Sequence, residues 1–341
     1  MEPPKGVCVA EFYTMGKMTK ILTNGRMLMD NRGAALIITL LIITTLAGLT
    51  IAFSQQSSVD LSLAGYTRDG YRASLLAHSG LNLALALLDE DEDRSMDSLT
   101  EEWGLFGVAS LPEKPSEEIT FSGHIIDENS KININKLIDD KGEIVETRLE
   151  QLLRLFTVLG LGEAHVNAIL DWLDSDDIKR MDGAEDYYYR NLERPYTCFN
   201  GPFMTTAQIF LVKGWKDIER FGEKNEKRLL NFLTVYGDQG LININTASRE
   251  ILMSLDEEID TAMAQSIIEH RTEEDFTTTS DLSKVPGIDE ELRKRISPWI
   301  TVNSSFFTIE LKVTCSEAMS HIRAVAERND DQSSLTYYQV M

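Results

Sequence analysis

The residues best suited to chemistry lie in one acidic run, residues 171–196, which reads DWLDSDDIKRMDGAEDYYYRNLERPY. Its carboxylates recur one or two residues apart around a glycine, so a loop here offers several oxygen ligands to a hard cation. Calcium takes about six to eight oxygens, and backbone carbonyls or water can complete a partial shell. The predicted calcium ligands are Asp174, Asp176, Glu185 and Asp186.

Two observations leave an alternative open for this loop. The carboxylates do not follow the twelve-residue spacing of an EF-hand. The chain carries a formal net charge of -22, so a solvated acidic loop without any metal is also expected from composition. That charge makes nucleic acid an unfavourable partner, because binding to a duplex depends on lysine and arginine neutralising phosphates.

Motifs for catalysis are absent from the sequence. It contains no G-x-S-x-G, no H-E-x-x-H and no P-loop, and its five histidines are scattered singly. We therefore predict that the protein is not an enzyme.

After the first apolar segment only Cys198 and Cys315 remain, and they either form one disulfide in an oxidising compartment or stay as two unpaired thiols.

The element that organises the rest of the chain is an apolar segment, residues 34–53, with no charged residue until Asp60. About 20 apolar residues are enough for a helix to cross a bilayer, and a helix satisfies its own backbone there. Lysine and arginine exceed acidic residues in segment 1–33, so the N-terminus is expected to stay in the cytoplasm and the acidic body to be exported. The leader also contains internal methionines, so the true start is open.

Processing of the leader has two possible forms. The segment after the apolar region shows no A-x-A context for an ordinary signal peptidase, which leaves an uncut signal anchor as one alternative. The other is a cut before the apolar region, between Gly33 and Ala34. The second alternative makes residues 1–33 a cytoplasmic leader that is removed.

Basic residues, Gly33, an uncharged apolar segment and an amphipathic helix together resemble a type IV pilin or pseudopilin precursor. That resemblance implies cleavage by a prepilin peptidase, methylation of the new amine and a single pass through the bacterial inner membrane with a periplasmic body. Most members carry glutamate at the fifth mature residue, where this chain has Ile38. In this respect the chain resembles the K-class minor pseudopilins of type II secretion, which have no subunit above them.

The K-class resemblance also implies partners and a site. The partners would be the other minor pseudopilins, of the I, J and H classes, and the inner-membrane assembly platform. A D-x-D followed by G-A-E-D in the acidic run is similar to the calcium-holding loop of that class. The implied function is that of the tip subunit of a pseudopilus that supports export of folded proteins across the outer membrane.

The pattern of the remaining chain predicts an α+β fold, with a long N-terminal helix packed on an antiparallel sheet and a large helical insertion. Strand patterns occur at 119–126, 306–315 and 321–329 and in the last eight residues, on both sides of that insertion. Helix is predicted over 147–173 and 223–235, among shorter segments. The predicted domains are 1–33 (leader), 34–53 (membrane half of the helix), 54–130 (first part of the pilin domain), 131–300 (insertion) and 301–341 (C-terminal strands).

An internal echo divides the insertion in two. KININKL at 131–137 recurs as LININTA at 241–247, which predicts two SAM-like or helix-hairpin-helix units, at 131–240 and 241–300. The turns of the second unit carry carboxylates, at 256–260 and 289–291, where a DNA-binding hairpin would present amides to phosphate. We therefore interpret the units as packing modules. A membrane-anchored DNA-uptake receptor remains the alternative from another class, and an uncleaved scaffold is a third.

Overall fold

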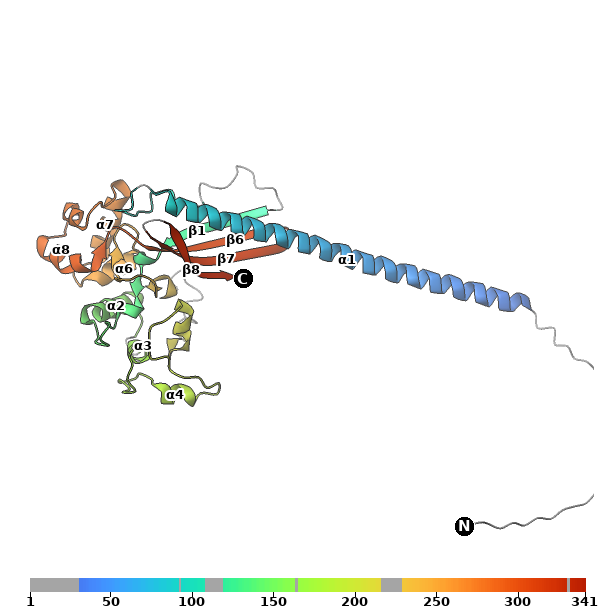
Figure 1. Ribbon diagram of the computed structural model, residues 1–341, viewed down its shortest axis with the longest axis horizontal. Coiled ribbons are helices and arrows are strands. Elements are labelled where there is room, and N and C mark those ends of the chain that lie inside the picture. Colours follow the sequence, from blue (N-terminus) through green and yellow to red (C-terminus); the bar gives the residue numbers. More distant parts are fainter. Residues whose placement is uncertain (1–30, 92, 108–118, 163–164, 216–228, 330–331) are drawn as a thin grey trace, which may run out of the picture. The chain divides into compact units, whose positions relative to one another are not determined.

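A computed structural model describes residues 31–91, 93–107, 119–162, 165–215, 229–329 and 332–341 (Figure 1). The chain divides into two units, Met1–Leu63 and Ala64–Met341. The first unit contains the N-terminal part of helix α1 (Asn31–Asp89). Within α1 an 18-residue window has a mean hydropathy of 2.5, and none of that window is buried. The length and composition of this helix therefore suit a membrane-crossing segment. Most of the predicted leader lies outside the described residues.

The second unit begins with the C-terminal part of α1, which packs on a four-stranded antiparallel sheet (Figure 1). The strand order is β1 (Ile119–Asp127), β6 (Phe306–Cys315), β7 (Ala318–Arg328) and β8 (Ser333–Val340). Small residues on α1 face the sheet, among them Ala77 and Ala84, and a Cβ atom on Gly80 would lie 2.9 Å from the Phe121 ring. The helix can therefore lie close to the strands, which confirms the predicted α+β fold.

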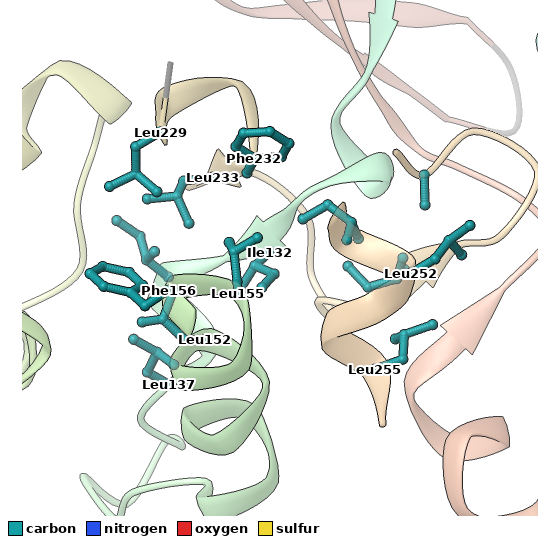
Figure 2. Packing of buried hydrophobic residues seen from close by; sticks show 14 of the residues in the cluster. Ile132, Leu137, Leu152, Leu155, Phe156, Leu229, Phe232, Leu233, Leu252 and Leu255 are labelled. Atoms are coloured by element: carbon teal, nitrogen blue, oxygen red, sulfur yellow. The ribbon is translucent and has the colours of Figure 1, made fainter. Parts of the chain in front are cut away.

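A helical domain interrupts the sheet between neighbouring strands. Asp127 ends β1 opposite Phe307 of β6, and residues 128–305 lie between the two strands in sequence. This segment has a hydrophobic core of its own, in which helices α2 and α6 are packed together (Figure 2). The elements of the domain are η1 (Glu128–Ser130), β2 (Ile132–Asn133), η2 (Ile134–Lys136), α2 (Glu146–Leu159), α3 (Val166–Leu173), α4 (Asp186–Arg190), η4 (Thr206–Leu211), η5 (Leu229–Asn231), β3 (Leu233–Thr234), β4 (Ile242–Asn243), α6 (Arg249–Leu255), α7 (Thr261–Glu273), η6 (Thr279–Lys284), α8 (Glu290–Ile296), η7 (Ser297–Trp299) and β5 (Ile300–Thr301).

The echoed sequences occupy equivalent structural positions. β2 pairs in parallel with β3, and β4 pairs in parallel with β5, so each ININ segment joins the strand that closes its own unit. The side chain of Asn135 bonds both backbone polar groups of Phe203, and Asn245 does the same with Phe276. A Thr capping box then starts η4 in the first unit and η6 in the second. The insertion is therefore built from two related units.

The structure corrects two expectations about this domain. The helix predicted over 147–173 is broken at Gly160, which adopts the left-handed conformation (φ 71°) and separates α2 from α3. Within the helix predicted over 223–235, the described residues form a 3-10 turn and then β3, because the short strand pairs with β2.

Cys198 and Cys315 are both free: Cys198 packs against the helical-domain core and Cys315 lies in the sheet core.

Candidate functional site

The acidic run places three carboxylates together in the first helical unit. Asp171 lies in the last turn of α3, Asp174 caps the C-terminus of that helix, and Glu185 precedes α4. One carboxylate oxygen from each lies within 4.8 Å of the others. The residues are 0%, 4% and 5% exposed, respectively. Three carboxyl groups thus meet in a buried position, which costs free energy unless positive charge compensates them.

Hydrophobic packing fixes the elements that carry these side chains. Every residue of α3 except Asn167 is buried, and the Trp172 ring stacks on Phe203 and meets the Tyr189 ring edge-on. Tyr189 belongs to α4, so the same aromatic cluster positions the helices on both sides of the carboxylates. A Cβ atom at Gly183 would lie 1.9 Å from an Asp171 oxygen. The glycine of the acidic run is therefore required by the close approach of the loop to Asp171.

Arg180 neutralises part of this group. Its Nη1 atom lies 2.9 Å from Oδ1 of Asp171 and also donates to Oδ2 of Asp174. Within the described residues, Oδ1 of Asp174 and both carboxylate oxygens of Glu185 are buried without a hydrogen-bond partner. Burial, together with the negative charges of Asp171 and Asp174, raises the pKa of Glu185 to about 7. The single positive charge of Arg180 therefore does not balance the three carboxyl groups.

This donor set fits a hard divalent cation. Three carboxylates offer oxygen ligands only, as calcium prefers, and the unpartnered oxygens of Asp174 and Glu185 are available to it. A cation would also remove the desolvation cost that raises the pKa of Glu185. Calcium would be held by Asp171, Asp174 and Glu185, with the remaining ligands supplied by backbone or water.

The structure brings together two of the four predicted ligands, Asp174 and Glu185, and places Asp171 beside them. Asp176 is exposed, and its Oδ1 accepts a hydrogen bond from the amide of Ile178 (2.6 Å) instead of joining the cluster. Asp186 accepts from the amide of Cys198 (3.1 Å) and pairs with Arg190 (2.6 Å). Asp171 replaces them, and its three-residue separation from Asp174 at the end of an apolar helix was the sequence signal for it.

A second acidic group is already compensated by protein side chains. Asp91, Asp97 and Glu101 lie together after α1, but Arg328 pairs with the first two and the Trp103 indole donates to Glu101. Each carboxyl therefore has a partner, and the group joins parts of the fold.

Gly33 and Ala34, the predicted cleavage position, lie in α1 and are exposed.

Three basic side chains of the second helical unit are engaged by carboxylates. Arg295 lies 3.0 Å from Asp256 and 2.7 Å from Glu258, both of which belong to the first turn of the hairpin. Lys294 pairs with Glu290 and Lys284 with Asp281, within 2.7 Å and 3.1 Å. Phosphate would have to displace these ion pairs, which disfavours the alternative of DNA binding.

Comparison with known proteins places both helical units in named families. Residues 130–237 match the family model of type II secretion system protein K, and residues 237–301 match a helix-hairpin-helix motif. The chain is 29% identical over 267 residues to the type II secretion system protein K of Pseudomonas aeruginosa, covering 74% of this chain and 76% of that protein. It is 24% identical over 311 residues to the protein K of Klebsiella pneumoniae, covering 87% and 92%.

The fold resembles a solved structure over most of its length. A chain in the crystal structure of the GspK–GspI–GspJ complex from enterotoxigenic Escherichia coli aligns with a TM-score of 0.63 at 19% identity. The alignment covers 81% of this chain and 98% of that chain.

Proposed function

This chain belongs to the type II secretion system protein K family and is a membrane-anchored minor pseudopilin, and from that premise we propose that it is the tip subunit of a periplasmic pseudopilus. In that position it supports export of folded proteins across the outer membrane. Its role is structural: it ends a fibre and presents a head to the secretion apparatus.

The observation that carries the tip assignment is the placement of the helical domain within the sheet. Residues 128–305 leave the pilin domain at the end of β1 and return at the start of β6, and they form a core of their own. A head of this size above the shaft would block further subunits from stacking on it. Ile38 supports the same arrangement, since it offers no carboxylate to the N-terminal amine of a subunit above.

The membrane half of α1 sets how the subunit reaches the fibre. A prepilin peptidase would cut after Gly33, the new amine would be methylated, and the helix would wait in the inner membrane with the body in the periplasm. The assembly platform would then move it into the pseudopilus. The exposed apolar residues along residues 34–53 match a helix that lies first in lipid and then among other subunit helices.

The partners proposed for this subunit are the I and J minor pseudopilins, with the H class below them. The protein K relative of known structure was crystallised with GspI and GspJ, and the fold is shared. Beyond the membrane segment, α1 exposes a further stripe in which Tyr71 and Leu75, four residues apart on one face of the helix, are each more than half exposed. This stripe is the contact face proposed for the neighbouring subunits.

Calcium would stabilise the head. Asp171, Asp174 and Glu185 would hold the ion and so fix residues 174–202 against α3. Because the ion balances buried negative charge, its role would be structural.

Removing the helical domain tests the tip assignment. Asp127 and Phe307 are paired neighbours, so a short glycine-containing turn can join β1 directly to β6 in place of residues 128–306. We expect secreting cells with this variant to form longer pseudopili, measured by electron microscopy, and a detergent-solubilised variant to retain binding to the I and J subunits. Unchanged fibre length with I and J binding intact would contradict the blocking role.

A further inference from the structure

A hollow lies beside the segment that joins the two helical units. Its volume is about 490 Å³, within the range of roughly 300–1,000 Å³ typical of ligand pockets. Asp238 on the joining segment and Asp139 and Asp140 on the loop after η2 contribute to its wall. It uses none of the three carboxylates of the candidate calcium site.

The walls combine apolar surface with negative charge. Ile138, Leu173 and Pro202 line the hollow, and Tyr236 lies in a stacked arrangement with Phe306 (centroids 6.4 Å apart, planes at 21°). Three aspartates share the rim, and among the described lining residues Lys136 is the single basic side chain. A ligand with an aliphatic stem and a cationic head complements both kinds of surface.

The joining segment is held rigidly. The side-chain amide of Asn133 donates to the carbonyl oxygens of Tyr236 and Gly237 (both 2.8 Å). Arg148 donates to the carbonyl of Gly240 (2.6 Å) and to that of Gln239. Because these groups are ordered before a ligand arrives, binding loses little conformational entropy.

Asp139 keeps its negative charge through local hydrogen bonds. Its Oδ1 accepts from the amides of Lys141 and Glu143, each at 2.9 Å. These bonds lower the pKa of Asp139 below its ordinary value. Asp139 therefore remains anionic across the neutral range.

A smaller hollow adjoins the first one. A second hollow of about 170 Å³ shares Gly237, Asp238 and Phe306 with the first and is also lined by Thr301 and Asn303. Because they share these lining residues, the two hollows adjoin one another. An extended polypeptide fits this shape, with one long side chain in the larger hollow and its backbone over the polar residues of the smaller one.

We propose that the double hollow binds an extended segment of a partner protein through one lysine or arginine side chain. The stem lies against Ile138, Leu173 and Pro202, and the charged head lies among Asp139, Asp140 and Asp238. The site is independent of leader cleavage and of the place of the subunit in the fibre.

The test uses the full chain in detergent and a blocked pentapeptide, a central arginine flanked by glycines, carrying an uncharged dye for fluorescence polarisation. The matched peptide carries citrulline, which keeps the shape and removes the charge. An exposed ion pair is worth roughly 1.5- to 5-fold in affinity, so we expect Asp139→Asn, Asp140→Asn and Asp238→Asn together to weaken binding at least about threefold. Asn at 139 retains the oxygen that accepts the two amides.

Two further variants make the test specific. Glu257→Gln, Glu273→Gln and Glu291→Gln together remove the same charge from exposed positions in the second helical unit and should leave the affinity within about twofold. Lys136→Gln removes the opposing cation and should tighten binding. Equal binding of the arginine and citrulline peptides, or equal loss in the two triple variants, would overturn the proposal. Binding of free n-butylguanidine as tight as that of the pentapeptide would overturn the assignment to a protein segment.

Discussion

Arg328 and Asp97 form a buried ion pair where the sheet meets the helical domain: Nη2 of Arg328 lies 2.6 Å from each carboxylate oxygen of Asp97. The side chains are 3% and 0% exposed. Asp97 also accepts a hydrogen bond from the amide of Ser304, the residue two before β6, and its own amide donates to the carbonyl of Val302. The pair therefore ties the segment after α1 to the point where the chain returns from the helical domain.

Loss of Arg328 should be strongly destabilising. Arg328→Met leaves Asp97 buried without its cation, and breaking a buried pair from one side costs about 3–5 kcal/mol. The measurement is urea denaturation of the full chain in detergent. Arg323→Met is the matched control on the same strand, because Arg323 pairs with Glu310 at 3.4 Å in a partly exposed position, and its loss should cost less than about 1 kcal/mol. Equal costs would show that the buried pair is not a major contributor.

Glu101 should make stability depend on pH. The pKa of Glu101 is raised to about 7, chiefly by burial and also by the Asp91 charge, while hydrogen bonding from the Trp103 indole opposes the rise. A carboxyl whose pKa is higher in the folded state favours folding below its unfolded pKa of ~4.3, and that contribution disappears as pH rises through 7. Glu101→Gln stays neutral, so relative to the parent it should gain about 1–2 kcal/mol between pH 4 and pH 8, allowing for partial solvent screening.

The readout for this prediction is the intrinsic tryptophan fluorescence of the parent and of the variant during urea denaturation at the two pH values. Other titrating groups cancel in the comparison of parent and variant, because both chains carry them. A gain at pH 8 no larger than at pH 4 would contradict a raised pKa for Glu101.

The two equivalent asparagines should differ in their contribution to stability. Asn245 is 2% exposed, whereas Asn135 is only partly buried. Asn245→Ala leaves the amide and carbonyl of Phe276 without partners in a dry position, which should cost about 2–4 kcal/mol. Asn135→Ala should cost less because water can reach Phe203, and Asn303→Ala, at an exposed position, should cost below about 0.5 kcal/mol. Denaturation midpoints order the three variants, and a smaller cost at Asn245 than at Asn135 would refute this account.

Local sequence patterns were sufficient for the sheet, for α1 and for the internal echo. The alternating faces of β6 and the apolar length of α1 are encoded in neighbouring residues, and the repeated asparagines mark one backbone-binding role used twice. The 3-10 turn and β3 at 229–234 were missed because β3 is a strand only by pairing with β2, about 100 residues earlier. Tertiary pairing of this kind leaves no periodic pattern in so short a segment.

The candidate site shows the same division between local and tertiary information. Composition and glycine content located the acidic loop and two of the three clustered carboxylates, Asp174 and Glu185. Asp171 was missed because an aspartate in an apolar helix resembles a capping or surface residue until the fold buries it. Asp176 and Asp186 were included because spacing alone does not tell which carboxylates bind local backbone amides.

Calcium affinity should distinguish the clustered carboxylates from Asp176. Asp171→Asn, Asp174→Asn and Glu185→Gln should each lower calcium affinity by at least about tenfold, since each removes a charged ligand from a buried site. Asp176→Asn should change it little. Arg180→Gln should raise the affinity, because Arg180 competes for Asp171 and Asp174. Isothermal titration calorimetry on the full chain measures all five. No calcium heat in the parent, or equal loss at Asp174 and Asp176, would reject the site.

Cleavage after Gly33 is the prediction on which entry into a fibre depends. A Cβ atom at Gly33 would have no heavy atom within 4 Å, so Gly33→Leu should leave helix α1 intact while blocking the peptidase, which must accommodate the residue before the cut. Gly48 has equally open surroundings, so Gly48→Leu is a matched control for an added side chain on the membrane helix. Intact mass spectrometry of protein recovered from secreting cells should show Ala34 as the first residue of the parent and of Gly48→Leu, and the whole leader on Gly33→Leu. If the leader remained on the parent while secretion proceeded, the chain would act as an uncut membrane anchor, and its helix could not be withdrawn into a pseudopilus in mature form.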